Sequence, residues 1–245
     1  MLKRIRIYLQ KLSKENNLIN ETVFVKAPLE IAEAIGNPDR YDYPLYKGKE
    51  FLVEANVRGV YGQAFTRIPH SYEGKISDIL DMDHTFEENT AILISTLNAV
   101  MRYLGMVANT RHCKDKEPGL CAKDLIPYLR ENYPSAKKIG LLGLQPAFLD
   151  SLSNAYGSEN VICSDLGYET VGSEKSGVCI LDGSEDNKKL MEESDLIFAT
   201  GTIFVNNTAD EIVRQAKIKP VVIFGVTAAG AAEMTGLPRY CPYSS

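Results

Sequence analysis

Short apolar runs alternate with helix-like segments through the second half of this chain, and this alternation restricts its fold more than any other feature. The runs lie at residues 138–144, 160–166, 176–182, 195–200 and 220–226, and each reads as a strand buried on both faces. Segments of helical character separate them, at residues 146–156, 187–194, 208–218 and 228–236. Such alternation is typical of a parallel sheet with helices on both faces. The sequence therefore predicts an α/β fold in which ligands bind at the carboxyl ends of the strands.

The first half of the chain has a different pattern, typical of an α+β unit. Its predicted elements are a strand at 22–27, a hairpin of the runs 50–57 and 60–68, and helices at 2–12, 75–82 and 85–105. Arg58 and Gly59 supply the turn of the hairpin. Thr85 and Glu88 fit a capping box at the start of the longest helix. We therefore expect a small sheet with helices that precedes the parallel sheet.

A polar stretch joins the two halves. Residues 108–120 are rich in charge and include Pro118 and Gly119, a composition that predicts a linker. A helix is predicted next, at 121–132, and Pro127 is expected to kink or split it because proline lacks a backbone N–H group.

The composition argues against several classes of function. The formal net charge of −5 argues against nucleic acid as the main partner, since phosphate binding requires a basic face. No apolar run reaches the roughly 20 residues that a membrane helix needs, and the basic N-terminus lacks the apolar segment of a signal peptide. We therefore expect a cytoplasmic protein with no membrane partner. The five cysteines are scattered and odd in number, so structural disulfides are not expected.

The first candidate ligand-binding residues follow the run 138–144. Gly143, Leu144 and Gln145 form a turn before the next helix, and Asp165 ends the following strand. That spacing is about where dinucleotide-binding folds place a carboxylate that binds the ribose. The pattern G-x-G-x-x-G is absent, however. Nucleotide binding, a tight turn beside another ligand and a turn without a ligand all remain open.

The second group lies in "ATGTIFVNNT", after the run 195–200. Helix capping by Thr208 and Glu211 explains the end of this stretch. The residues that capping leaves unexplained are Thr200, Gly201, Thr202, Asn206 and Asn207. Hydroxyls and amides beside a glycine at a strand end suit a hydrogen-bonding cradle for a ligand. The alternative is a loop that satisfies its own backbone.

The third group follows the run 220–226. Gly225 and Thr227 lie at the strand end, and Gly230 would let a helix start approach another backbone or an anion. The alternative is close packing of that helix on the sheet through small residues. Because glycine recurs with Thr, Gln or Asn at three strand ends, we favour a ligand site.

A cluster of soft donors lies in the predicted linker. His112, Cys113 and Cys121 are within ten residues of one another, and Cys241 could add a fourth ligand from the end of the chain. Thiolates and imidazole suit a transition metal such as zinc. The spacing matches no closed zinc module, so a solvated linker with incidental cysteines is the competing interpretation.

These motifs together resemble the DUF364 family, a family of Rossmann-like proteins associated with heavy-metal chelation. The resemblance rests on "TLNAV", "GLLGLQPAF", "ATGTIFVNNT" and "GVTAAGAAEMTGLPRYCPY", and it covers most of the chain. It implies a first domain similar to the enolase N-terminal domain, at 1–113, and a Rossmann-like domain at 114–245. It also implies a site in the cleft between them. The hairpin "VYGQAFT" and the segment "ANTR" would close that cleft, with Asn109 and Arg111 as contacts for an anion or a carboxylate.

The resemblance implies a small-molecule-binding protein that handles a heavy metal, a metal chelate or a metal-containing cofactor. Gly143 and Asp165 motivate a second hypothesis, a transferase or oxidoreductase that uses S-adenosylmethionine or a nucleotide cofactor. The third hypothesis is a non-catalytic sensor or assembly module. No catalytic constellation is recognisable, so the sequence leaves open whether the protein is an enzyme. A homodimer is the general expectation for a protein of this size.

Overall fold

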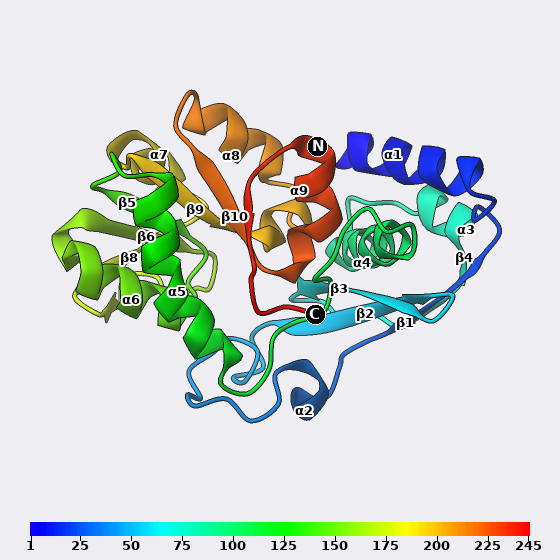
Figure 1. Cartoon of the computed structure of the whole chain (residues 1–245), viewed down its shortest axis with the longest axis horizontal. Helices are drawn as coiled ribbons and strands as arrows, with labels where there is room; N and C mark the ends of the chain where they lie inside the picture. Colours follow the sequence, from blue (N-terminus) through cyan, green and yellow to red (C-terminus); the bar gives the residue numbers. More distant parts are fainter.

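The computed structural model describes residues 1–245 and contains two sheets, with helix α4 packed between them (Figure 1). The first sheet is antiparallel, with the strand order β3-β2-β1-β4. Its strands are β1 (Thr22–Lys26), β2 (Phe51–Val57), β3 (Val60–Thr66) and β4 (Tyr72–Lys75). The helices of this half are α1 (Leu2–Glu15), α2 (Ile31–Ala34), α3 (Ile76–Asp81) and α4 (Glu87–Tyr103). Helices α1, α3 and α4 cover one face of the sheet, and α2 lies on the other side (Figure 1).

The predicted hairpin of β2 and β3 is confirmed. Val57 pairs with Val60 across a two-residue turn in which Arg58 and Gly59 have φ angles of 52° and 79°. Both values are left-handed, as the favoured turn for such a short hairpin requires. Strand β4 and helix α2 were not expected from the sequence, because each is too short to show a period.

Helix α4 is the central element of the molecule. Every residue from Thr90 to Met101 is buried, because the helix packs on β2 and β3 with one side and on α1 and α9 with the other. Gly62 permits this close approach, since a methyl group at that position would lie 2.2 Å from the backbone nitrogen of Ala99. Helix α4 therefore belongs to the core of both halves.

The second sheet has the strand order β11-β10-β9-β5-β6-β8-β7. Its strands are β5 (Ile139–Leu142), β6 (Val161–Asp165), β7 (Glu174–Lys175), β8 (Val178–Asp182), β9 (Leu196–Thr200), β10 (Val221–Phe224) and β11 (Arg239–Tyr240). All pairs are parallel except β7 with β8. The chain starts at β5, moves outward through β6 and β8, and returns to β9 on the other side of β5. This is the doubly wound Rossmann order, with its topological switch point between β5 and β9.

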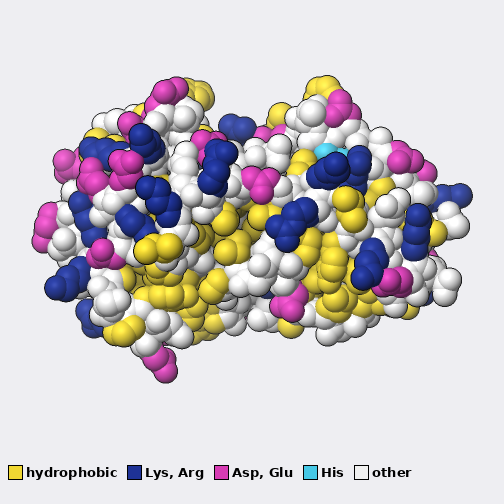
Figure 2. Space-filling model, turned by 90° about the horizontal axis from the view of Figure 1, so that it is seen from above, with side chains coloured by type: hydrophobic (Ala, Val, Ile, Leu, Met, Phe, Trp, Pro, Cys, Tyr) yellow, Lys and Arg dark blue, Asp and Glu magenta, His cyan; other side chains and the backbone are white.

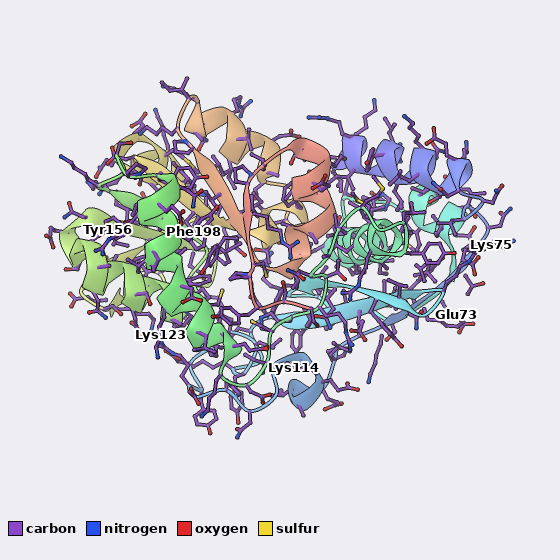
Figure 3. All side chains as sticks on the ribbon, in the orientation of Figure 1. Glu73, Lys75, Lys114, Lys123, Tyr156 and Phe198 are labelled. Atoms are coloured by element: carbon purple, nitrogen blue, oxygen red, sulfur yellow. The ribbon has the colours of Figure 1, made fainter.

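Helices cover both faces of the second sheet, so the predicted α/β fold class is confirmed. They are α5 (Glu117–Asn132), α6 (Pro146–Tyr156), α7 (Asn187–Glu193), α8 (Ala209–Ala216) and α9 (Ala229–Thr235), with 3-10 turns η1 (Ser158–Asn160), η2 (Gly201–Phe204) and η3 (Val226–Ala228). Figure 3 shows Tyr156, at the end of α6, and Glu73 and Lys75, on β4, at opposite ends of the molecule. None of the helices is long and apolar enough to cross a membrane.

Alternate residues of the second sheet enter two different cores. Ile197 and Ala199 of β9 face α7, α8 and α9, in a core that continues through α4 into the first sheet. Leu196 and Phe198 face α5 and α6, in a core that also takes in Leu29 to Leu52 of the first half. Each core therefore contains residues from both halves of the chain.

The polar stretch 108–120 is not a free linker. The backbone of Arg111 exchanges hydrogen bonds with that of Ser245, at 2.8 and 3.0 Å, and Gln63 N–H donates to the carbonyl of Thr110 at 3.0 Å. Helix α5 begins within the stretch, at Glu117, and it continues through Pro127 without being split. The polar sequence indicated exposure, whereas its backbone is paired to the end of the chain and to β3.

Both predicted capping boxes are absent. Helix α4 begins at Glu87, and the hydroxyl of Thr85 donates instead to Asp83 at 2.7 Å. Thr208 precedes α8 but makes no side-chain cap, because its backbone is already in a helical conformation rather than the extended one that a capping side chain needs.

The surface carries charges of both signs. Figure 2 shows Lys and Arg side chains interspersed with Asp and Glu over both halves, and hydrophobic side chains gathered in the central and lower parts of that face.

Candidate functional site

A cavity of about 240 Å³ lies between the two halves, at the carboxyl ends of β5, β6, β9 and β10. From the first half it is lined by Ile35, Tyr43, Pro44, Leu45, Lys49, Glu50, Phe65, Thr66, Arg67 and Glu87. From the loops after the parallel strands it is lined by Gly143, Leu144, Gln145, Asp165, Thr200, Gly201, Thr202, Asn206, Gly225 and Thr227. The structure thus brings the three predicted groups of loop residues to one cavity, because parallel strands end at the same edge of the sheet.

The floor of the cavity is the switch point of the sheet. Gly143 follows β5 with a φ angle of 88°, and a methyl group there would lie 2.6 Å from Cγ2 of Thr200 at the end of β9. Glycine is therefore needed both for the backbone conformation and for the contact between the two loops. An open α/β sheet binds its ligands at this point.

Asp165 holds two of the loops together. One of its carboxylate oxygens accepts the N–H of Leu144 at 2.7 Å, and the other accepts the N–H of Gly167 at 2.7 Å and the hydroxyl of Thr170 at 3.2 Å. Most of its acceptor capacity is consequently used within the protein. The arrangement gives Asp165 a structural role and does not favour the ribose-binding role considered from the sequence.

The loop after β9 presents hydroxyls and an amide to the cavity. Thr200 accepts hydrogen bonds from the backbone N–H and the hydroxyl of Thr202, at 3.4 and 3.2 Å, which fold the chain into the 3-10 turn η2. Asn206 follows one turn later and lines the cavity, and its side chain has no hydrogen-bond partner within the protein. Part of the loop therefore forms hydrogen bonds within itself, as the competing interpretation expected. The side chain of Asn206 remains available to a ligand.

The loop after β10 connects the cavity to the first half. The hydroxyl oxygen of Thr227 accepts the backbone N–H of Phe65 at 2.9 Å, and Thr227 is almost fully buried. Gly201 allows the neighbouring loop to pass close by, because a methyl group there would lie 2.8 Å from the backbone nitrogen of Ala228. Thr227 therefore connects the two halves by a hydrogen bond and also lines the cavity.

Three predicted ligand contacts lie outside the cavity. Asn207 is exposed, with a φ angle of 57°, and does not line the cavity. Arg111 pairs with Glu54 at 2.9 Å and lies over the ring of Tyr61. The backbone carbonyl of Asn109 accepts a hydrogen bond from Arg239, and Asn109 does not line the cavity. The structure therefore does not bring these residues together with the rest.

The predicted metal ligands surround one part of the cavity without forming a metal centre. His112, Cys113, Cys121 and Cys241 all line it, but no group of three or more His, Cys, Asp or Glu side chains is arranged to hold a metal ion. The Nδ1 atom of His112 is 3.1 Å from the carbonyl oxygen of Ala34. Burial lowers the pKa of His112 to about 4 and raises that of Cys121 to about 12, so the imidazole is neutral and the thiol stays protonated at neutral pH. The metal-site prediction is therefore not supported by the geometry.

An apolar and aromatic wall forms this half of the cavity. Phe148 and Phe224 have ring centroids 5.1 Å apart, and Tyr240 packs beside them with its hydroxyl donating to the carbonyl of Cys121 at 2.7 Å. Phe198 lies behind them in the body of the second sheet (Figure 3). Such a wall suits the flat or aliphatic body of a small molecule.

The opposite half of the cavity is polar and ionisable. It includes Glu50, Arg67 and Glu87 from the first half of the chain, facing the end of β6. The pKa of Glu50 is raised to about 7, chiefly by burial and also by the nearby carboxylates of Asp165 and Glu87, while Arg67 acts to lower it. The cavity is therefore apolar at one end and acidic at the other.

The sequence did not indicate the contribution of residues 36–50, which we call the rim segment. This loop runs from the first half to the second along the lower edge of Figure 1, and its Tyr43 and Leu45 are buried in the core around α5 and α6. The available signal was the presence of these apolar residues in "YDYPLYKGKEF", a stretch otherwise rich in Pro, Gly and charge. Residues of that kind in a loop indicate that it is covered by another element.

Comparisons with known proteins agree with this architecture. A family model described as "DUF364: Putative heavy-metal chelation" matches residues 128–236. No curated protein matches the chain. A structure of unknown function from Pyrococcus horikoshii, also of the DUF364 family, is 18% identical with a TM-score of 0.58, covering 93% of this chain and 79% of that chain. One from Desulfitobacterium hafniense, of the same family and also of unknown function, is 13% identical with a TM-score of 0.51, covering 76% of this chain and 73% of that chain. At such identities the likeness establishes the fold.

Proposed function

We propose that this chain, whose residues 128–236 match the DUF364 family model, binds a small molecule with an apolar body and a polar end in the cavity between its two halves. Any heavy metal that it handles enters as part of that molecule, as a chelate or a metal-containing cofactor. The observation that carries the proposal is the mixed lining of the cavity, which combines the aromatic side chains of Phe148, Phe224 and Tyr240 with polar side chains that are not fully hydrogen-bonded within the protein.

The unpaired polar groups support a ligand rather than a solvent-filled gap. The side chains of Glu50 and Asn206 have no partner within the protein, and Gln145 uses only its oxygen, which accepts the N–H of Phe148 at 2.6 Å. All three residues are partly exposed and line the cavity, so their free donors and acceptors can be reached from it. A ligand that offered donors and acceptors to these three side chains would complete them.

The absence of converging ligands bears on the form in which a metal would bind. A bare transition-metal ion needs about three or four protein ligands with suitable geometry. His112 is held by Ala34, and the thiols that line the cavity do not gather around a point. A metal that arrives with an organic ligand needs no such cluster, since the protein then has only to recognise the organic part.

Native mass spectrometry of protein purified without added ligand tests the proposal. We expect a bound mass that is lost on denaturation, and elemental analysis of the same sample reports whether a metal accompanies it. Asn206→Ala removes a contact of the cavity and is expected to weaken retention about fivefold to tenfold.

Asn207→Gly is the matched control. Asn207 is the next residue but lies outside the cavity with a positive φ angle, which glycine tolerates, so its substitution is expected to leave retention unchanged. If the wild-type protein carries no bound mass and takes up no small organic molecule on titration, the proposal is wrong.

A further inference from the structure

Three carboxylates line the cavity, and two of them are already bonded within the protein. Asp165 accepts two backbone N–H groups and a hydroxyl. Glu87 accepts the hydroxyl of Thr66 at 2.9 Å, the backbone N–H of Arg67 at 2.7 Å and the guanidinium of Arg67 at 2.8 Å. Glu50 has neither a hydrogen bond nor an ion pair from its side chain. It is thus the one acid of the lining that is free to meet a ligand.

The cations of the lining are not free to pair with Glu50. Arg67 is engaged by Glu87, and the ammonium of Lys49 is engaged by Glu169. In each pair the cationic side chain of Arg67 or Lys49 is already bound to a carboxylate other than that of Glu50. The charge of Glu50 consequently has no counter-ion in the protein.

The surroundings of Glu50 disfavour its negative charge. Burial removes water from the carboxylate, and the charges of Asp165 and Glu87 repel it, so that its pKa rises to about 7. A carboxylate of this kind gains more from a positive partner than a fully exposed one would, because it is partly shielded from water and the local dielectric constant is lower.

We infer that Glu50 is the specificity-determining residue of the cleft and that it selects ligands whose polar end carries a cationic group, such as an ammonium. The inference rests on the proposed function, since it names the chemistry of the ligand that the same cavity takes. The aromatic wall receives the uncharged body of the ligand, and Glu50 receives its positive end through a charge-assisted hydrogen bond.

The charged groups around Glu50 determine how the selection depends on pH. Asp165 and Glu87 face it from β6 and α4, Arg67 follows β3, and Lys49 precedes Glu50 on the rim segment. Other titratable groups of the lining, His112, Cys113, Cys121 and Tyr240, are neutral near pH 7 because burial disfavours their charged forms and shifts each pKa away from neutrality. Preference for a cation is therefore expected to be full at pH 8 and to be lost as the pH falls below 7.

The experiment uses two pairs of probes on the full chain. Each pair joins an aromatic ring to either an ammonium or a hydroxyl: benzylamine with benzyl alcohol, and 3-phenylpropylamine with 3-phenylpropan-1-ol. The two lengths sample different distances between the aromatic wall and Glu50. Dissociation constants are measured by chemical-shift titration of ¹⁵N-labelled protein at pH 8 and at pH 5.5.

We expect at least one amine to bind about tenfold more tightly than its alcohol at pH 8, the ratio typical of a charge-assisted hydrogen bond. At pH 5.5 the ratio should fall to within about twofold. Glu50→Gln keeps the size of the side chain and should abolish the ratio at both pH values. Glu88→Gln, a carboxylate nearby on α4 that does not line the cavity, should leave it intact.

The possible results separate the two proposals. If amines and alcohols shift the same cavity resonances with equal affinity, Glu50 does not select a cation, while the cavity remains a small-molecule site. An amine preference that persists in Glu50→Gln also overturns the inference. If none of the four probes shifts resonances of the cavity at either pH, the inference fails, while the proposed function is decided separately by the bound mass in native mass spectrometry. The unfolding temperature of Glu50→Gln, measured alongside, shows that a lost preference is not a lost fold.

Discussion

The two halves of the molecule meet in two places that differ in chemistry. We call the first place the base contact, and it is formed around Asn98 of α4. The Asn98 side chain donates to the carbonyls of Gln63, Val226 and Thr227 and accepts the N–H of Gly230 at 2.7 Å. All of these groups belong to the buried backbone or to a side chain with no exposed surface. Along the rim segment, by contrast, ion pairs between partly exposed side chains, Arg40 with Asp150 and Lys49 with Glu169, join the halves.

This difference indicates how the cavity can admit a ligand. A buried amide that satisfies four backbone groups cannot leave them without exposing unpaired donors and acceptors, which costs about 1–3 kcal/mol for each group. Exposed ion pairs contribute only about 0–1 kcal/mol and are weakened by salt. The halves are therefore expected to stay joined at the base contact, while opening of the cavity breaks the ion pairs of the rim segment and also lifts Tyr43 and Leu45 out of the core around α5 and α6.

Removing the amide at the base contact should have the largest effect. Asn98→Ala leaves the N–H of Gly230 and the carbonyls around it without a partner, and we expect the free energy of unfolding to fall by about 2–4 kcal/mol. Urea denaturation measures it. Asn89→Ala on the same helix is the control, because Asn89 makes a single exposed bond to the carbonyl of Asp83 and should cost well under 1 kcal/mol. Equal losses of unfolding free energy in Asn98→Ala and Asn89→Ala would show that the base contact is no stronger than an exposed hydrogen bond.

Replacing Glu50, at the end of the rim segment, should change the free energy of unfolding by an amount that depends on pH. Its folded-state pKa of about 7 lies above the ordinary value of 4.5, so the folded state favours the protonated carboxyl. That contribution is complete below pH 4.5 and is lost as the pH rises through 7. Glu50→Gln should therefore stabilise the protein by about 1–3 kcal/mol at pH 8 and change nothing at pH 4. Thermal unfolding across this range checks the prediction, and a constant effect at every pH would contradict it.

Thr227 tests the base contact on the side nearest to the cavity. Thr227→Val keeps the shape of the side chain but leaves the N–H of Phe65 without an acceptor, with an expected loss of about 1–2 kcal/mol. Thr227→Ser retains the hydroxyl and should recover most of that loss in the same denaturation experiment. A serine variant as unstable as the valine variant would show that the methyl group, rather than the hydrogen bond, matters there.

The smallest effect on the free energy of unfolding is expected for the ion pair of Arg40, on the rim segment. Arg40→Ala removes the pair with Asp150 and should lower the free energy of unfolding by no more than about 1 kcal/mol. Its effect should appear instead in amide hydrogen exchange, where the rim segment exchanges faster while the buried turns of α4 do not change. High salt should produce the same pattern in the wild-type protein. Faster exchange in α4 as well would show that the two contacts open together.

Local patterns in the sequence were sufficient to predict the parallel sheet and the position of the cavity. The apolar runs from Lys138 onward are strands because they are buried on both faces, and the glycines at 143, 201 and 225 mark where the loops approach one another. These features depend on residues that are neighbours in the chain, so their pattern is visible without the structure.

The rest depends on contacts between distant residues. The free carboxylate of Glu50 could not be recognised, because its freedom results from the pairing of Arg67 with Glu87 and of Lys49 with Glu169. The partners of Asp165 were not visible for a related reason, since its spacing from Gly143 is that of a ribose ligand whereas its oxygens accept hydrogen bonds from neighbouring loops. Sequence position indicates that a side chain reaches a site, but its partners determine whether it is available.

A crystal structure of the protein with 3-phenylpropylamine or benzylamine bound at pH 8 is the most direct test of the cavity as a ligand site. The account predicts density in the cavity at the ends of β5 and β9, with the ring against the wall that includes Phe224 and the ammonium within hydrogen-bonding distance of Glu50. A probe that binds only elsewhere on the protein, or that enters the cavity with its ammonium turned away from Glu50, would contradict it.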